Sequence, residues 1–183
     1  MIQCKYNEAV GRMSRPSRLA LVVAKTEQGL ANIITLGWFM RTSITPPMFA
    51  ISVGFTRYSH EILQQNRHFV LAIPSIIMVK ETMQCGLQSG RDVDKISEFN
   101  IKTQRGKLTE IPLLSDAVAN FECKIITQVG GGDHTIFVGE VKYAWQHKDE
   151  ALEQLLSIPI DDSRFEELMH QGGYAFGKIK GNK

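Results

Sequence analysis

Two segments of alternating apolar and polar residues, separated by glycines, constrain this chain more than any other feature. The first runs from Phe121 to Val129 and the second from Thr135 to Trp145, with Gly130-Gly-Gly132 before the second. In both segments apolar side chains recur with a period of two, and charged residues such as Glu122 and Lys142 fall on the opposite side. A period of two is that of a β-strand, and a glycine turn between two such runs predicts a long antiparallel hairpin.

The rest of the chain predicts further short strands and few helices. Apolar runs predict strands at Leu19–Lys25, Leu30–Phe39, Met48–Val53 and Phe69–Ile73. The expected helices are Tyr58–Asn66, Ile76–Cys85, Val93–Phe99, Asp149–Leu156 and a helix-like Arg164–His170, and Asn100–Ser115 is expected to be a loop. Six or more strands with so few helices predict a mainly β fold with flanking helices, an antiparallel barrel or sandwich. We expect a single domain over 1–183, with a core of about 12–147 and a helical C-terminal segment over 148–183.

Composition excludes several classes of protein. The 183 residues carry 21 Lys and Arg against 19 Asp and Glu, a net charge of +2, which argues against a dedicated binder of nucleic acid or of anionic membranes. The longest apolar runs, such as Leu19–Ala24, are far shorter than the ~20 residues that span a bilayer. The chain starts without the apolar stretch of a secretory signal, and its three cysteines form no CxxC pair. We therefore expect reduced thiols in a cytoplasmic protein.

Several catalytic motifs are incomplete. His60-Glu61 begins a zinc-protease pattern, but Gln64 stands where the second histidine is needed. Gly172–Lys178 has most of the spacing of a nucleotide-phosphate loop, but Ile179 stands where that motif needs Ser or Thr. The chain also lacks the glycine-flanked serine of the hydrolases and the glycine pattern of dinucleotide-binding folds. We expect no metal site and no serine hydrolase.

Two polar turns carry the residue types that hold a phosphate group. Arg57-Tyr58-Ser59 lies where a strand meets the N-terminus of a helix, and free backbone N–H groups, a hydroxyl and a guanidinium together bind anions. The simpler alternative is that Thr56 or Ser59 caps the helix and Arg57 is solvated. Ser89–Lys95 supplies a serine, an arginine and a lysine in a second turn, which equally fits an ordinary helix start. Taken alone, each pattern favours the simpler structural role.

Two more features have both a structural and a functional interpretation. Asp133-His134-Thr135 follows the glycine turn, where a polar cluster at a barrel rim can reach a ligand, or where Asp133 only stabilises the turn. Trp38 and Phe39 lie near the end of a strand that is expected to be half buried. Such aromatic residues usually belong to the core, although a tryptophan at a strand end can also line a planar ligand.

These clusters belong to a longer succession of motifs. The most specific are Ser89-Gly-Arg-Asp-Val-Asp-Lys95 and Gly132-Asp-His-Thr-Ile-Phe-Val-Gly-Glu-Val141. The weaker ones are Arg15-Pro16, Ala20-Leu-Val-Val23, Gly29-Leu-Ala-Asn32, Thr35-Leu-Gly-Trp38-Phe39, Pro46-Pro47, Arg57-Tyr-Ser59, Phe69-Val-Leu-Ala-Ile-Pro74 and Phe121-Glu-Cys-Lys124. Their order and spacing, over roughly residues 12–145, resemble the flavin reductase-like, FMN-binding split-barrel family, and within it the flavoredoxin-type branch.

This resemblance implies a homodimeric split β-barrel that holds FMN noncovalently near the subunit interface. The cofactor-binding residues that it implies are Asn32, Thr35, Leu36, Trp38, Ser52, Arg57, Ser59, Ser89, Lys95, His134 and Phe176. Arg57 and Ser59 would meet the phosphate with Lys95 nearby, and His134 would approach the flavin from the hairpin. An aromatic residue of the C-terminal Tyr174-Ala-Phe176, assigned as Phe176, would cover the flavin. The chain departs from many relatives at Thr35-Leu36-Gly37, where they have Pro-Phe-Ser.

Three functions follow from these expectations. The first is an oxidoreductase that takes hydride from NADH or NADPH and passes electrons to free flavin or to a redox protein. The second is an FMN electron carrier without pyridine-nucleotide activity. The third is a barrel that binds another planar ligand such as haem, with His134 as an axial ligand. No catalytic residue is assigned, because the flavin would supply the chemistry and His134 is only a candidate proton donor.

Overall fold

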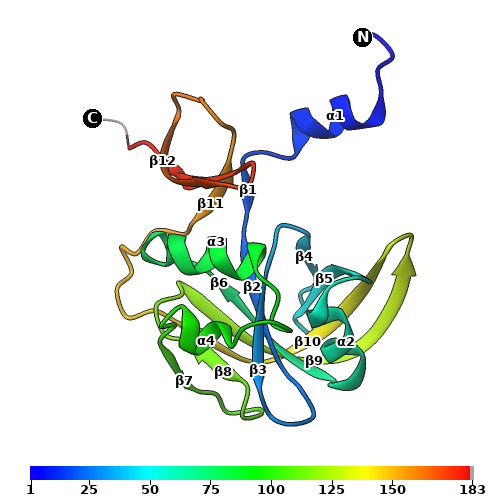
Figure 1. Ribbon diagram of the computed structural model, residues 1–183. Coiled ribbons are helices and arrows are strands. Elements are labelled where there is room, and N and C mark those ends of the chain that lie inside the picture. The colour runs from blue at the N-terminus through cyan, green and yellow to red at the C-terminus, as the bar shows by residue number, and fades with distance from the viewer. Residues whose placement is uncertain (182–183) are drawn as a thin grey trace.

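The computed structural model describes residues 1–181, and most of its strands form one antiparallel sheet that curls into a barrel (Figure 1). The strand order is β3-β2-β6-β9-β10-β5-β4, formed in that order by Ala31–Leu36, Ala20–Lys25, His68–Ile73, Ala119–Gly131, His134–Gln146, Met48–Gly54 and Phe39–Ser43. The two edge strands, β3 and β4, are joined only by Gly37 and Trp38. The Ser52 N–H donates to the Trp38 carbonyl at 3.0 Å, so the link is tied to β5. The predicted antiparallel split barrel is therefore confirmed.

The remaining elements flank this barrel. The helical segments are α1 Tyr6–Met13, α2 Tyr58–Gln65, η1 Ile76–Met78, α3 Val79–Leu87 and α4 Lys95–Glu98. A second sheet has the order β1-β11-β13-β12, formed by Ser17–Arg18, Leu156–Ile158, Tyr174–Ile179 and Phe165–Gln171. A small hairpin pairs β7 Thr103–Arg105 with β8 Pro112–Leu114. None of the helices formed by residues 1–181 has the length and apolar character needed to cross a membrane.

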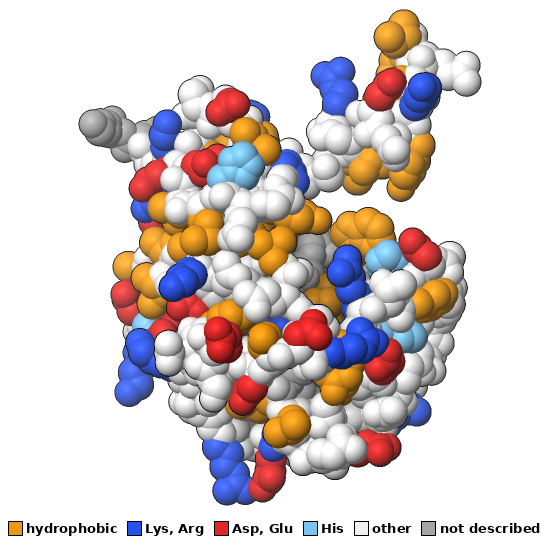
Figure 2. Space-filling model, in the orientation of Figure 1, with side chains coloured by type: hydrophobic (Ala, Val, Ile, Leu, Met, Phe, Trp, Pro, Cys, Tyr) orange, Lys and Arg blue, Asp and Glu red, His pale blue; other side chains and the backbone are white. Residues whose placement is uncertain are grey.

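The β2 strand is buried on both faces, which explains its unbroken apolar run. Ala20 and Val22 pack in the barrel interior with residues such as Phe69 and Phe137. Leu21, on the other face, belongs to a second cluster with side chains from η1, α3 and β8. A strand covered on both sides needs apolar residues at every position, so its sequence shows no alternation. α1, in contrast, has no buried residue and stands away from the barrel (Figures 1 and 2).

The predicted hairpin and the central helices are confirmed. β9 and β10 pair in antiparallel register, for example Ile136 opposite Val129. The helices expected at 58–66, 76–85 and 93–99 occur as α2, as η1 with α3, and as α4. The expected strand Leu30–Phe39 is divided into β3 and β4, and the expected loop Asn100–Ser115 contains the β7–β8 hairpin.

The prediction of a helical C-terminal segment over 148–183 is wrong for residues 148–181. Residues 182–183 lie outside the residues that the structure describes. The expected helix Asp149–Leu156 is a turn followed by β11, and Arg164–His170 forms most of β12. The pairing of β12 with β13 shifts register between Glu167 and Met169. Because this bulge interrupts the period of two, the apolar residues of β12 are spaced as they would be on a helix.

The alternating pattern also misplaces Glu122. Its side chain is only 1% exposed instead of facing solvent. The carboxylate accepts hydrogen bonds from the backbone N–H groups of Lys107 and Leu108 and from Trp145 Nε1 at 2.8 Å. These donors satisfy the buried carboxylate, so β9 is covered on this face too.

Close packing around Gly139 generates a stability prediction. A Cβ atom at this position would lie 2.7 Å from the Phe69 ring and 3.0 Å from Cys123 Cβ. We expect Gly139→Ala to lower the free energy of unfolding by about 1–3 kcal/mol, because a filled core resists an added methyl group. Urea unfolding measures the change, with Gly130→Ala as the matched control, since a Cβ at Gly130 meets no atom within 4 Å. Equal losses in both variants would contradict this account.

Candidate functional site

The N-terminus of α2 is not capped by a side chain. Arg57 is the N-cap residue, in extended conformation, and makes no side-chain cap hydrogen bond. Ser59 is buried, and its Oγ accepts a hydrogen bond from Asn32 Nδ2 at 2.7 Å. The simpler alternative, in which Thr56 or Ser59 caps this helix, is therefore wrong. The positive end of the helix dipole lies beside the exposed Arg57, an arrangement that attracts anions.

Asn32, on β3, connects this helix start to the loop 88–94. Its Oδ1 atom is buried and has no hydrogen-bond partner among the described residues. A Cβ on Gly90 would lie 1.9 Å from Oδ1, so this close approach requires glycine. A cleft of about 360 Å³ adjoins these groups and is lined by residues of 26–32, by Tyr58 and by residues of 90–96. An unsatisfied buried amide costs about 1–3 kcal/mol, which a bound polar group could recover.

Two further predicted residues are Ser89, in this loop, and Lys95, the first residue of α4. Ser89 Oγ accepts a hydrogen bond from the Arg91 N–H at 3.2 Å, and Arg91 forms an ion pair with Glu61. Lys95 is 3% exposed, and its Nζ donates to the carbonyls of Ile33 and Cys85 at 2.7 and 2.8 Å. Burial lowers the pKa of Lys95. The structure therefore gives Lys95 a buried position between β3 and α3.

Trp38 and His134 form the other half of the site. Trp38 is 64% exposed, so it does not have the core position that is usual for such aromatic residues. Its ring centroid lies 4.8 Å from that of His134, at the start of β10. The His134 Nδ1–H donates to Asp133 Oδ1 at 2.5 Å, and this hydrogen bond lowers the pKa of Asp133. The link from β3 to β4 and the hairpin turn therefore present one aromatic pair with a fixed imidazole orientation.

Three other predicted residues flank this pair. Ser52 lies on β5, where its N–H holds the Trp38 carbonyl. Thr35 Oγ1 donates to the Thr82 carbonyl of α3 at 2.6 Å. Leu36 is partly buried and packs against the barrel core. The structure therefore brings Thr35, Leu36, Trp38, Ser52 and His134 to the place where the barrel closes.

Phe176 does not lie at this surface. It is 4% exposed and packs in the cluster of Leu19, Met83 and Leu155, between β13 and α3. Tyr174, two residues earlier, is 50% exposed. The assignment of Phe176 as a cover for a ligand is therefore wrong, because the second sheet needs this side chain in its own core.

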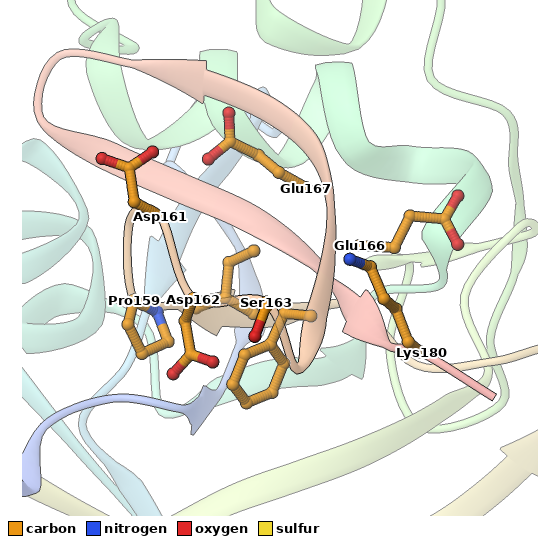
Figure 3. A pocket seen from close by; sticks show the side chains of 9 residues that line it. Pro159, Asp161, Asp162, Ser163, Glu166, Glu167 and Lys180 are labelled. Atoms are coloured by element: carbon orange, nitrogen blue, oxygen red, sulfur yellow. The ribbon is translucent and has the colours of Figure 1, made fainter. Parts of the chain in front are cut away.

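A second cavity, larger than the cleft beside Asn32, lies elsewhere, against β12. It measures about 490 Å³, and Figure 3 shows Asp161, Asp162, Glu166 and Glu167 around it with Lys180 beside Glu166. It contains none of the residues singled out from the sequence. Among residues 1–181, no group of three His, Cys, Asp or Glu side chains is arranged to hold a metal ion.

His60 is a neighbour of the site that the sequence interpretation did not assign. Its Nε2 lies 2.8 Å from Thr135 Oγ1, and its ring packs edge-on against Phe55 and Phe137. His60 lies three residues after Arg57, in the first turn of α2. This spacing was the feature of the sequence from which its closeness to the site could have been inferred.

Comparisons with known proteins bear on the whole fold. Residues 12–173 match the model of the flavin reductase like domain. The NADH-dependent flavin reductase StyB of Pseudomonas fluorescens is 28% identical over 138 residues, which is 75% of this chain and 76% of that protein. A high molecular weight rubredoxin of Moorella thermoacetica is 33% identical over 98 residues, 52% of this chain and 42% of that protein. The crystal structure of flavoredoxin from Methanosarcina acetivorans superposes with a TM-score of 0.79 at 24% identity, covering 100% of this chain and 93% of that one.

The environment of His60 generates a prediction about pH. Burial lowers the pKa of His60 below its ordinary value of 6.5; Glu61 opposes this effect and His134 adds to it. Between the two pKa values the unfolded chain binds a proton that the folded chain does not, so stability is lost as pH falls through this window. We expect the urea midpoint to fall between about pH 7 and about pH 5, and to fall less in His60→Gln. Parallel curves for the two proteins would rule out this contribution. Burial is also the main cause that lowers the pKa of His68. The variant His68→Gln measures how much His68 contributes to the same loss of stability.

Proposed function

The chain belongs to the family of proteins with a flavin reductase-like domain, and on that premise we propose that it binds FMN noncovalently as an oxidoreductase. In this proposal it takes hydride from NADH or NADPH and passes electrons to free flavin or to a redox protein. The single observation that carries the proposal is the junction of Asn32, Ser59 and Gly90. There a buried amide oxygen has no hydrogen-bond partner within residues 1–181 and lies beside a helix start without a side-chain cap. The flavin, when bound, would supply the hydride and electron chemistry.

The phosphate end of the site would be the N-terminus of α2. Arg57 offers a guanidinium, the first turn of the helix offers N–H groups, and Ser59 offers a hydroxyl already oriented by Asn32. Charge-assisted hydrogen bonds from such groups are stronger than neutral ones. Ser89 and Gly90 would approach from the facing loop, where the absence of a Cβ allows the backbone to come close.

The ring end of the site would be the closure of the barrel. Trp38 and His134 offer an aromatic wall, and Ser52 and Thr35 lie on the strands beside it. Asp133 holds the Nδ1–H of His134 and thereby leaves Nε2 as the group that can meet a ligand. The protein's part in the reaction is to orient the reacting rings and to exclude water from between them.

A homodimer is part of this proposal. Side chains on β10 alternate, with Phe137 in the core and Ile136 on the outer face. Ile136 is 38% exposed, its neighbour Val129 is 57% exposed and Met40 on β4 is 64% exposed. An apolar outer face of this kind, beside the exposed Trp38, is typical of an interface between subunits.

A second candidate function is favoured by one relative. The likeness to a high molecular weight rubredoxin supports an electron carrier without pyridine-nucleotide activity. The two functions share the FMN site and differ only in whether a nucleotide delivers hydride.

One experiment tests both functions. The protein is incubated with FMN, passed through gel filtration to remove free flavin, and mixed anaerobically with NADH and separately with NADPH. We expect retained flavin bands that bleach with one nucleotide or both. Retained bands that bleach with neither support the carrier, and loss of all flavin, with no binding in a fluorescence titration, overturns the FMN site. The eluted fraction is expected to sediment as a dimer at micromolar concentration.

The phosphate end of the site gives a sharper prediction. We expect the double variant Arg57→Ala, Ser59→Ala to weaken FMN binding by one to two orders of magnitude, about 1.5–3 kcal/mol, because charge-assisted contacts are lost. Flavin-fluorescence titration measures the affinity. Arg105→Ala is the matched control, because Arg105 lies on the distant β7–β8 hairpin. An unchanged affinity in the double variant would remove both residues from the site.

A further inference from the structure

The N-terminal segment and the C-terminal hairpin are bound to each other next to the candidate site. Arg15 Nη2 donates a hydrogen bond to the Gly173 carbonyl at 3.3 Å, across 158 positions of the chain. The guanidinium carbon of Arg15 lies 5.9 Å from the centre of the Tyr174 ring, within the range of a cation–π contact. We refer to Arg15, Gly173 and Tyr174 as the N–C clamp.

The N–C clamp rests on the end of α3 that also contacts β3. The turn of the β12–β13 hairpin packs on Leu87, since a Cβ on Gly172 would lie 3.0 Å from Leu87 Cδ2. On the other side of the same helix end, a Cβ on Gly86 would lie 3.3 Å from Thr35 Cβ. The clamp is therefore connected through one helix end to the strand that leads to Trp38.

The hairpin that carries Gly173 and Tyr174 lies beside a hollow in the surface. In Figure 1 the tip of the β12–β13 hairpin and the C-terminal end of α3 are directed toward the side of the molecule that carries β4 and β5. Figure 2, in the same orientation, shows a recess between the C-terminal strands and that side. A molecule that lies in this recess would have the C-terminal strands on one side and the part of the barrel with β4 and β5 on the other.

Within the part of the chain that the structure describes, the charge of Arg15 is not paired with a carboxylate. A guanidinium has five N–H donors, and the contact with Gly173 uses one. Arg91, Arg105 and Arg164 each form an ion pair, but within residues 1–181 no carboxylate lies within 4.0 Å of the half-buried Arg15. A guanidinium with free donors beside a half-exposed tyrosine ring suits a ligand that carries both a phosphate and a planar ring.

We propose that the N–C clamp binds the reduced pyridine nucleotide, with Arg15 on its pyrophosphate and the Tyr174 ring against one of its heterocycles. This inference rests on the proposed function and deepens it, because it assigns the donor site to residues that the FMN site does not use. Arg15 is then a specificity-determining residue for the electron donor. FMN binding does not depend on it.

The test compares two arginines three positions apart in the FMN-loaded protein. Arg15→Gln is expected to raise the KM for the nucleotide roughly ten- to hundredfold with kcat little changed, because one charge-assisted contact to the substrate is lost. Arg18→Gln removes the same charge from an exposed position on β1 and is expected to leave KM unchanged. Added salt is expected to raise the KM of the wild type more than that of Arg15→Gln.

A second pair of variants keeps the inference testable if Arg15→Gln folds poorly. Tyr174→Leu is expected to raise KM and Tyr174→Phe to leave it near the wild-type value, while both keep the wild-type affinity for FMN. An equal KM in the wild type, Arg15→Gln and Tyr174→Leu would overturn the clamp as donor site and leave the reductase function standing. A wild type that retains FMN but neither binds nor oxidises either nucleotide would overturn the clamp together with the reductase function, and the electron carrier would remain.

Discussion

The buried ammonium group of Lys95 joins the edge strand β3 to helix α3, beside the candidate site. Lys95 Nζ bonds the Ile33 carbonyl of β3 and the Cys85 carbonyl of α3. β3 is an edge strand, and an unpaired edge carbonyl otherwise invites pairing with another chain. Burying a cation is unfavourable unless its hydrogen bonds are made, so Lys95 keeps β3 and α3 at a fixed separation. Asn32 lies beside Ile33 on this strand, and Thr35 follows two residues later.

The candidate site lies where the barrel closes because closure brings distant segments together. The β3–β4 link contributes Trp38, the β9–β10 turn contributes His134, and the start of α2 contributes Arg57 and Ser59. These segments are far apart in the chain. Pairing of β5 with both β4 and β10 sets Trp38 beside His134. A hydrogen bond from Asn32 to Ser59 joins the edge strand β3 to the start of α2. A ligand that contacts all of them would stabilise the closed barrel, since it binds the folded chain only.

The elements that could be predicted from the sequence are those whose pattern is local. The β9–β10 hairpin and α2 have a clear period and clear boundaries, and both occur as predicted. β12 was mistaken for a helix because its bulge is set by pairing with β13. Glu122 was placed in solvent because its donors come from a loop about 15 residues away.

In the candidate site, too, some residues could be identified from a local motif and others depend on tertiary packing. The choice of Asn32 and Ser59 as site residues follows from a family motif, whereas the burial of Phe176 depends on how the second sheet packs on α3. Arg15 was noted only as part of a motif before a strand. Its contact with Gly173 joins the two ends of the chain, and no local pattern predicts such a contact.

The three cysteines differ sharply in their surroundings, and this difference gives the protein a natural attachment point for a probe. Cys85 and Cys123 are buried, and burial raises the pKa of each thiol to about 12. Cys4 is exposed, just before the free-standing α1. A maleimide dye added near neutral pH would therefore label one position without any engineering, since the thiolate is the reactive form. Energy transfer between two dyes so attached would report the distance between the N-terminal helices of two associated chains.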